Sequence, residues 1–114
     1  MVNKWEIYFC NLDPTVGSEQ KGTRPMLIIS TDLVNHTLPV SAVLPLSSSK
    51  DGDKIYPTEL LLAPTITNLP KLSVAMVQQI RTLSHNRLTA LVGKITDSET
   101  KERILDACRS YFDL

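Results

Sequence analysis

The segment DPTVGSEQKGTRPMLIIS (residues 13–30) joins a polar stretch to an apolar one. Its first thirteen residues contain two prolines and two glycines beside a glutamate, a lysine and an arginine. Two residues are enough to connect antiparallel strands, so a connection of this length is typical of a loop with a functional role. The MLIIS run (residues 26–30) is apolar on both faces, which is typical of a central strand. Pro25 can stand only at the entrance of that strand because it lacks a backbone N–H.

Apolar and β-favouring runs on either side of this segment predict an antiparallel sheet. The first run, WEIYFCNL (residues 5–12), ends at a turn signal. The polar residues 47–54 predict a surface loop, and residues 31–35 predict a helical turn capped by Ser30 or Thr31. The strands predicted from these patterns are 5–12, 26–30, 40–46, 58–62, 72–80 and 91–95.

The spacing of apolar residues changes near the end of the chain. In TDSETKERILDACRSYF (residues 96–112) they recur with a helical period, and Thr96 and Glu99 have the spacing of a capping box. Strands followed by a helix, with hairpin-length links, predict one α+β domain that spans residues 1–114. We expect this domain to be mainly β, a small SH3-like antiparallel barrel or coiled sheet that carries a C-terminal helix.

Composition argues against a disordered chain and against nucleic-acid binding by bulk attraction. Hydrophobic residues make up 42% and charged residues 21% of the 114 residues, as in globular proteins, and the formal net charge is zero. The charges are unevenly distributed along the chain, because residues 60–96 contain no acidic side chain. The four bases in that stretch either form a positive face with Lys21 and Arg24 or are separate solvated charges. These bases are Lys71, Arg81, Arg87 and Lys94.

The sequence shows no pattern of metal ligands. Cys10 and Cys108 each lie among apolar residues, which favours a role as small core side chains, and His36 and His85 are isolated. We therefore expect no metal and no cofactor. The N-terminal residues lack the apolar stretch of a signal peptide, which favours a cytoplasmic protein.

Residue chemistry alone supports an anion or RNA site only weakly. Glu19 and Arg24 either form a surface ion pair or a catalytic couple, and the loop that holds them can present backbone N–H groups and a guanidinium to an anion. The hydroxyls of residues 47–49 follow a predicted strand and fit either a solvated turn or a phosphoryl contact. Gln78, Gln79 and Arg81 could read RNA or simply form a polar edge, and strand alternation predicts Gln79 and Arg81 on one face.

The stretch LDPTVGSEQKGTRPMLIIS (residues 12–30) resembles the opening signature of the MazF/PemK/Kid toxins of bacterial toxin–antitoxin systems. The similarity continues through Asn35, VLPLSSS (43–49) and VQQIRTLSHNRL (77–88) to the closing helix, so it covers nearly the whole chain. It implies a MazF/CcdB-like fold, a homodimer, and a type II toxin that cleaves single-stranded mRNA, specifically for sequence and independently of the ribosome. It also implies a MazE/PemI-like antitoxin whose flexible tail covers the RNA groove.

The resemblance implies roles for individual residues. Arg24 matches the catalytic arginine of the family, Ser47 stands where the family commonly has a catalytic threonine, and Glu19 matches a glutamate near the scissile site. Cleavage would need no metal and would proceed through a 2′,3′-cyclic phosphate. A guanidinium does not readily lose its proton, so Arg24 would stabilise charge and Glu19 would be the candidate base. The residues expected to contact RNA are Pro14, Gly17, Ser18, Gln20, Lys21, Ser48, Gln78, Gln79 and Arg81.

Two positions depart from the family pattern and leave alternatives open. Gln78 stands where relatives often carry an acid, and Trp5 replaces the glycine that usually precedes the acidic residue of the first strand. A CcdB-like toxin that binds DNA gyrase is one alternative. A degenerate relative that binds RNA or antitoxin without cleaving is the other. The sequence leaves the cleavage motif, the identity of the antitoxin and the general base undetermined.

Overall fold

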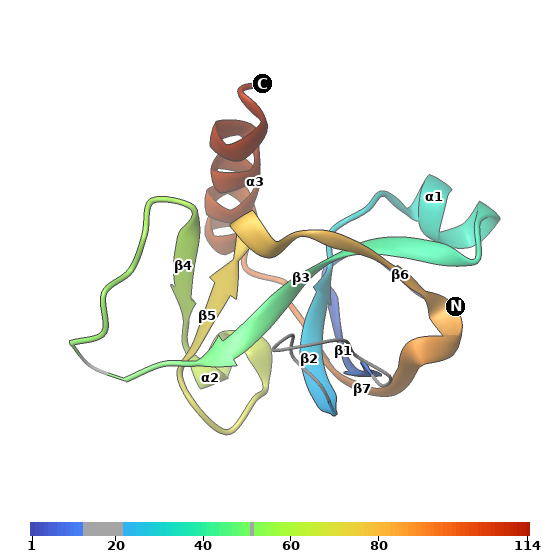
Figure 1. Ribbon diagram of the computed structural model, residues 1–114, viewed down its shortest axis with the longest axis horizontal. Helices are drawn as coiled ribbons and strands as arrows, with labels where there is room; N and C mark the ends of the chain where they lie inside the picture. Colours follow the sequence, from blue (N-terminus) through green and yellow to red (C-terminus); the bar gives the residue numbers. More distant parts are fainter. Residues whose placement is uncertain (13–21, 51) are drawn as a thin grey trace.

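A computed structural model describes residues 1–12, 22–50 and 52–114 of the chain (Figure 1). In this part of the chain, four short helical segments lie between strands before a longer helix closes the sequence. The strands are β1 (Glu6–Asn11), β2 (Thr23–Ile28), β3 (Val40–Ser48), β4 (Glu59–Leu62), β5 (Ser73–Met76), β6 (Arg81–Ser84) and β7 (Leu88–Lys94). The helices are α1 (Asp32–Thr37), α2 (Pro64–Thr67) and α3 (Ser98–Phe112), with 3-10 turns η1 (Val77–Gln79) and η2 (His85–Arg87).

All strand pairs of the described sheet are antiparallel, in the order β4-β5-β3-β2-β1-β7, with β6 also paired to β3. β3 is shared by two parts of this sheet, because Val40–Val43 pair with β6 and Leu46–Ser48 pair with β5. Figure 1 shows β3 crossing the molecule, with β4 and β5 near one end and α1 near the other. The prediction of an antiparallel, coiled sheet followed by a C-terminal helix is confirmed.

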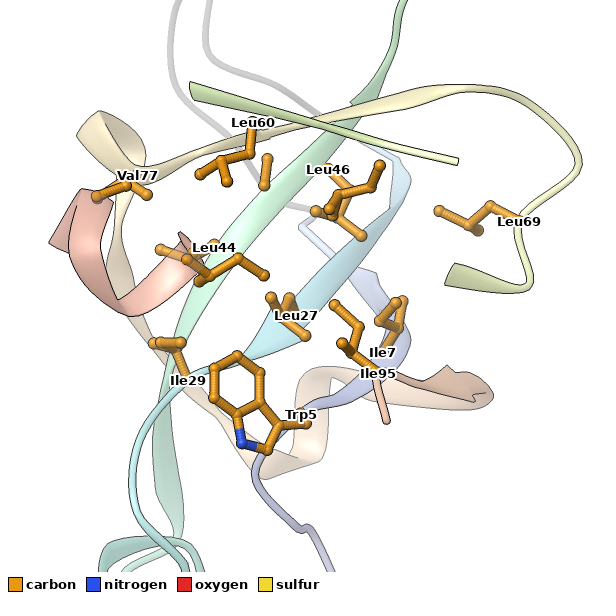
Figure 2. Close-up of a cluster of buried hydrophobic side chains, with 14 residues drawn as sticks. Trp5, Ile7, Leu27, Ile29, Leu44, Leu46, Leu60, Leu69, Val77 and Ile95 are labelled. Carbon is orange, nitrogen blue, oxygen red and sulfur yellow. The ribbon is translucent and has the colours of Figure 1, made fainter. Parts of the chain in front are cut away.

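Apolar side chains pack on both faces of the central strand β2. Leu27 and Ile29 enter one cluster, which also holds Ile104 and Ala107 of α3 (Figure 2). Met26 and Ile28 enter a second cluster with Cys10, Val43 and Leu83. Since successive side chains of a strand point to opposite faces, residues 26–29 are buried on both sides, as their composition predicted. The predicted bounds are wrong, because β2 begins at Thr23 and ends at Ile28, and Pro25 lies within the strand as the partner of Phe9 rather than at its entrance.

The prediction of one strand over residues 72–80 is wrong. β5 ends at Met76, and residues 77–79 form the turn η1, in which the Ile80 N–H donates to the Val77 carbonyl at 3.0 Å. The turn is needed because β5 pairs with the end of β3, whereas β6 pairs with its beginning. β6 itself was not predicted, β7 begins at Leu88 rather than residue 91, and α2 was missed.

The helix caps agree with the sequence in one case and differ in the other. Thr31 caps α1 and accepts a hydrogen bond from the Val34 N–H, as predicted. α3 is capped by Asp97 instead of Thr96, since the Asp97 carboxylate accepts hydrogen bonds from the Thr100 N–H at 2.9 Å and the Thr100 hydroxyl at 2.6 Å. These bonds hold the pKa of Asp97 below its ordinary value. No helix in the described ranges is long and apolar enough to cross a membrane.

Trp5 occupies a backbone conformation that glycine prefers. Its φ is +76°, which costs a residue with a Cβ about 1–2 kcal/mol. The indole is nonetheless buried in the larger cluster (Figure 2), and the ammonium groups of Lys4 and Lys101 lie 5.2 and 5.7 Å from the ring centroid. Trp5 therefore combines local backbone strain with packing between the N-terminus and α3.

This conformation predicts an unusual order of stability for two variants of Trp5. Both lose the ring, and Trp5→Ala should cost about 3–5 kcal/mol. Trp5→Gly should be the more stable of the two by about 1 kcal/mol, because glycine adopts a positive φ without strain. Urea unfolding followed by circular dichroism measures the difference. At the exposed helical position Ser110 the order should reverse, with Ser110→Ala more stable than Ser110→Gly. A Trp5→Ala variant more stable than Trp5→Gly would contradict the strain argument.

Candidate active site

One cavity of about 200 Å³ brings together the ends of two strands and the segment between α2 and β5. One side of this cavity is formed by β1, β2 and β3, and the other by residues 69–73. Its lining residues are Phe9, Thr23, Arg24, Pro25, Leu46, Ser47, Ser48, Leu69, Pro70, Lys71 and Ser73. The described lining therefore carries two cations and four hydroxyls, with no carboxylate among them.

Strand register places Arg24 beside Ser47. β2 pairs with β3 through Met26 opposite Pro45 and Leu27 opposite Leu44. The same register, continued for two more residues, brings Arg24 opposite Ser47, and both side chains are half-buried at the cavity. Both ion pairs of the described chain belong to Arg109, so neither engages Arg24. The guanidinium and the hydroxyl thus face the same small volume.

Six loop residues that the sequence singled out lie outside the described residues. They are Pro14, Gly17, Ser18, Glu19, Gln20 and Lys21. The two ends of this loop are brought together by β1 and β2, because Asn11 pairs with Thr23 and the Leu12 N–H donates to the Gly22 carbonyl at 3.0 Å. Gly22 has a φ of +80°, in the region where glycine is unstrained. The loop therefore starts and ends next to Arg24.

The predicted RNA contacts Gln78, Gln79 and Arg81 do not line this cavity. The alternation predicted for them is wrong, because Gln78 and Gln79 lie in η1 and Arg81 opens β6. The Gln78 amide accepts a hydrogen bond from the Thr58 hydroxyl at 3.0 Å and donates one to the Glu59 carboxylate at 2.6 Å. A carboxylate thus lies next to Gln78, whose own side chain is uncharged.

Lys71 is a charged cavity residue for which the sequence predicted no specific role. It belongs to residues 60–96, which contain no acidic side chain, and it lines the cavity together with Arg24. For this one base, the structure agrees with the alternative in which the bases form a positive face with Arg24. The other bases of the stretch lie elsewhere in the sheet. In the strand registers, Arg81 of β6 lies opposite Val43 of β3 and Lys94 of β7 lies opposite Glu6 of β1. The Arg87 guanidinium donates a hydrogen bond to the Asn11 carbonyl. The only sequence signal for Lys71 was the missing negative charge around it.

The cysteines and histidines have structural surroundings. Cys10 is fully buried, and burial raises the pKa of its thiol to about 12, so it remains protonated at neutral pH and packs as a core side chain, as expected. A ring nitrogen of His36 lies 2.9 Å from the Asn3 side-chain oxygen, and one of His85 lies 2.7 Å from the Ser41 hydroxyl. Within the described residues, no three His, Cys, Asp or Glu side chains are grouped to hold a metal ion.

Comparison with known proteins gives the family of the chain. Residues 3–111 match the model of the PemK-like, MazF-like toxins of type II toxin–antitoxin systems. Endoribonuclease MazF of Staphylococcus saprophyticus is 35% identical over 102 residues, which cover 90% of this chain and 84% of that protein. Endoribonuclease EndoA of Bacillus subtilis is 32% identical over 107 residues, which cover 94% of this chain and 90% of that protein.

Solved structures share the fold. An endoribonuclease from a mycobacterial species, in complex with its cognate antitoxin, superposes with a TM-score of 0.81 at 21% identity, covering 100% of this chain and 97% of that one. MazF from Deinococcus radiodurans gives a TM-score of 0.77 at 21% identity, covering 99% and 97%. The sequence matches and the fold agree, and the chain belongs to the PemK-like, MazF-like toxin family of type II toxin–antitoxin systems.

Proposed function

We propose that this toxin is a sequence-specific endoribonuclease that cuts single-stranded mRNA independently of the ribosome, in the cytoplasm. The observation that carries the proposal is the meeting of Arg24 and Ser47 at one cavity whose described lining holds no carboxylate, in a chain 35% identical to an endoribonuclease. A cavity with positive charge and hydroxyl donors favours a phosphodiester group. Single-stranded RNA fits better than a duplex, because its bases can turn out of the stack toward the protein.

The proposed reaction uses the RNA's own 2′-hydroxyl as nucleophile. This hydroxyl loses its proton and attacks the adjacent phosphorus, the bond to the 5′-oxygen breaks, and that oxygen takes a proton. The products are a 2′,3′-cyclic phosphate and a 5′-hydroxyl. Arg24 stabilises the negative charge of the phosphorane, and Ser47 donates a hydrogen bond to a non-bridging oxygen. Glu19 is our candidate for the base, and no step requires a metal.

Two protein partners belong to this proposal. The chain acts as a homodimer, with RNA bound across two subunits, and a MazE/PemI-like antitoxin blocks the groove. The mycobacterial endoribonuclease and the Deinococcus MazF were both solved with an antitoxin, which supports the second partner. Large apolar side chains on the described surface, Leu33, Leu38 and Leu91 among them, support burial against protein.

The homodimer predicts a particle mass. Light scattering at micromolar concentration should give about twice the 12.7 kDa mass of the chain. Dilution should lower the mean mass toward that of one chain, since association depends on concentration. A single 12.7 kDa species that still cleaves RNA would contradict the dimer.

The role of Ser47 predicts different effects for two substitutions. Ser47→Ala removes one hydrogen bond to the transition state and should slow cleavage by about 10²-fold or more, by analogy with the loss of an oxyanion-hole donor. Ser47→Thr keeps the hydroxyl and should remain active. Single-turnover cleavage of a long RNA measures both, with Ser110→Ala as a control on α3, outside the cavity. If Ser47→Ala cuts at the wild-type rate, Ser48 becomes the donor to test.

The internal nucleophile predicts the response to a single 2′-deoxy nucleotide placed 5′ to the scissile phosphate. This RNA should still bind but resist cleavage completely. Arg24→Lys should lose most activity on the all-ribose RNA, because an ammonium cannot reproduce the bidentate geometry of a guanidinium. Gel analysis in excess EDTA measures both effects, with Arg103→Lys on the exposed face of α3 as the matched control.

The same gel separates the alternatives. Cleavage of the deoxy-substituted RNA would exclude the internal nucleophile, and activity that depends on added magnesium would overturn the metal-free mechanism. A wild-type protein that binds RNA without cutting it would indicate the degenerate relative. A protein that neither binds nor cuts RNA would favour the gyrase-binding alternative.

A further inference from the structure

The wall of the cavity opposite Arg24 and Ser47 has its own cation. It consists of Leu69, Pro70, Lys71 and Ser73, which follow α2 and lead into β5. The Lys71 side chain is exposed, and no described residue pairs with it in an ion pair. Among the described lining residues, Arg24 and Lys71 therefore supply two positive charges and no side chain supplies a negative one.

The backbone that carries Lys71 is anchored to the sheet at the end of α2. Asn68 ends α2 with a φ of +64°, and its side-chain amide donates to the Val92 carbonyl of β7 at 2.8 Å. Gly93 permits this approach, because a Cβ at that position would lie 2.8 Å from the Thr67 carbonyl oxygen. The buried Leu69 side chain extends toward the apolar cluster around Leu46 (Figure 2).

The other end of the segment is tied to the strand that carries Ser47. The Ser73 hydroxyl donates to the Lys71 carbonyl at 3.1 Å, and the Ser49 N–H donates to the Leu72 carbonyl at 2.9 Å. Ser48 pairs with Ser73 in the β3–β5 ladder. The same register brings Lys71 alongside residue 50, three residues beyond Ser47, which is about 10 Å along a strand. This spacing favours contact with a different phosphate from the one at Ser47.

Apolar side chains line the same cavity as the two cations. Phe9 and Pro25 are cross-strand partners on β1 and β2, and both line the cavity together with Leu69 and Pro70. Apolar and aromatic side chains hold nucleobases by stacking without demanding one base in particular. The cavity volume of about 200 Å³ is below the roughly 300–1,000 Å³ of pockets that enclose drug-sized ligands, which suits one nucleotide.

We propose that Lys71 binds the RNA phosphate next to the scissile one, so that the cavity holds a single nucleotide between two phosphate sites. The nucleoside between these phosphates packs on Phe9, Pro25, Leu69 and Pro70. This assignment rests on the proposed endoribonuclease function and makes Lys71 a substrate-positioning residue. Lys71 helps to bind the RNA and to position its scissile phosphate, while the phosphodiester bond is cleaved at Arg24 and Ser47.

The first test measures binding as a function of salt. A single-stranded RNA that wild type cuts is mapped, and a version with a 2′-deoxy nucleotide at the cut site is titrated with Lys71→Ala, Lys71→Arg and Lys94→Ala. Each phosphate contact on a single strand contributes about 0.7 to the slope of log K against log salt. Lys71→Ala should lower the magnitude of the slope by about that amount per site. Lys71→Arg should keep the wild-type slope. Lys94→Ala should keep it as well, because Lys94 lies on β7 opposite Glu6 of β1 and does not line the cavity.

The second test locates the phosphate. In a set of the same RNAs, one phosphodiester at a time is replaced by a neutral methylphosphonate. Wild type should bind more weakly when a phosphate adjacent to the scissile one is neutral. Lys71→Ala already lacks the contact with that phosphate, so neutralising it should not weaken RNA binding by this variant any further. Equal losses in both proteins at both neighbouring phosphates would overturn the assignment. An unchanged salt slope in Lys71→Ala would overturn it as well.

Failure of the proposed function gives a different result. If wild type cuts no RNA in EDTA or magnesium, the endoribonuclease assignment fails, and the salt slope measured on an unmodified oligonucleotide then decides whether Lys71 contacts phosphate. If wild type cuts RNA but Lys71→Ala binds and cuts as wild type does, the nuclease stands and the Lys71 site is wrong.

Discussion

The pairing of β3 with strands on both sides is the constraint on which the site depends. One edge of β3 aligns with β2, so Arg24 comes opposite Ser47 by continuation of a register that is fixed deeper in the sheet. Near its end, β3 also aligns with β5, which brings the segment of Lys71 to the same place. Three parts of the chain that are remote in sequence thus line one small cavity, and a slip of either ladder would separate them.

Burial on both faces makes that register hard to change. Met26 and Ile28 fill one apolar cluster, while Leu27 and Ile29 fill the other. A shift of β2 by one residue would exchange the two sets and move every side chain to the opposite face. The strand that carries Arg24 is therefore held by its own apolar residues. A rigid scaffold of this kind holds the end of β1 and the start of β2 in place beside Arg24.

Polar contacts fix the end of the molecule that lies away from the cavity. Asn35 of α1 is buried, and its side-chain oxygen accepts hydrogen bonds from the hydroxyls of Ser30 and Ser41. Since the Ser41 proton is used in that bond, its oxygen accepts from the His85 Nε2–H. This network joins α1, β3 and η2 without leaving a buried polar side-chain atom unpaired among the described residues.

The sequence by itself determined the elements with a strong local signal. These are the apolar residues 26–29 that are buried on both faces of the sheet, the cap of α1 at one of the two predicted residues, and the closing amphipathic helix. Burial pattern, capping and helical period are each set by a few neighbouring residues. The turn at residues 77–79 and the short strand β6 were decided only by the tertiary structure, because pairing with β3 forces both. The cap at Asp97 is a local feature that the sequence pattern assigned one residue too early. Lys71 also needed the tertiary structure, because its place beside the cavity comes from the β3–β5 ladder, a contact between residues far apart in the chain.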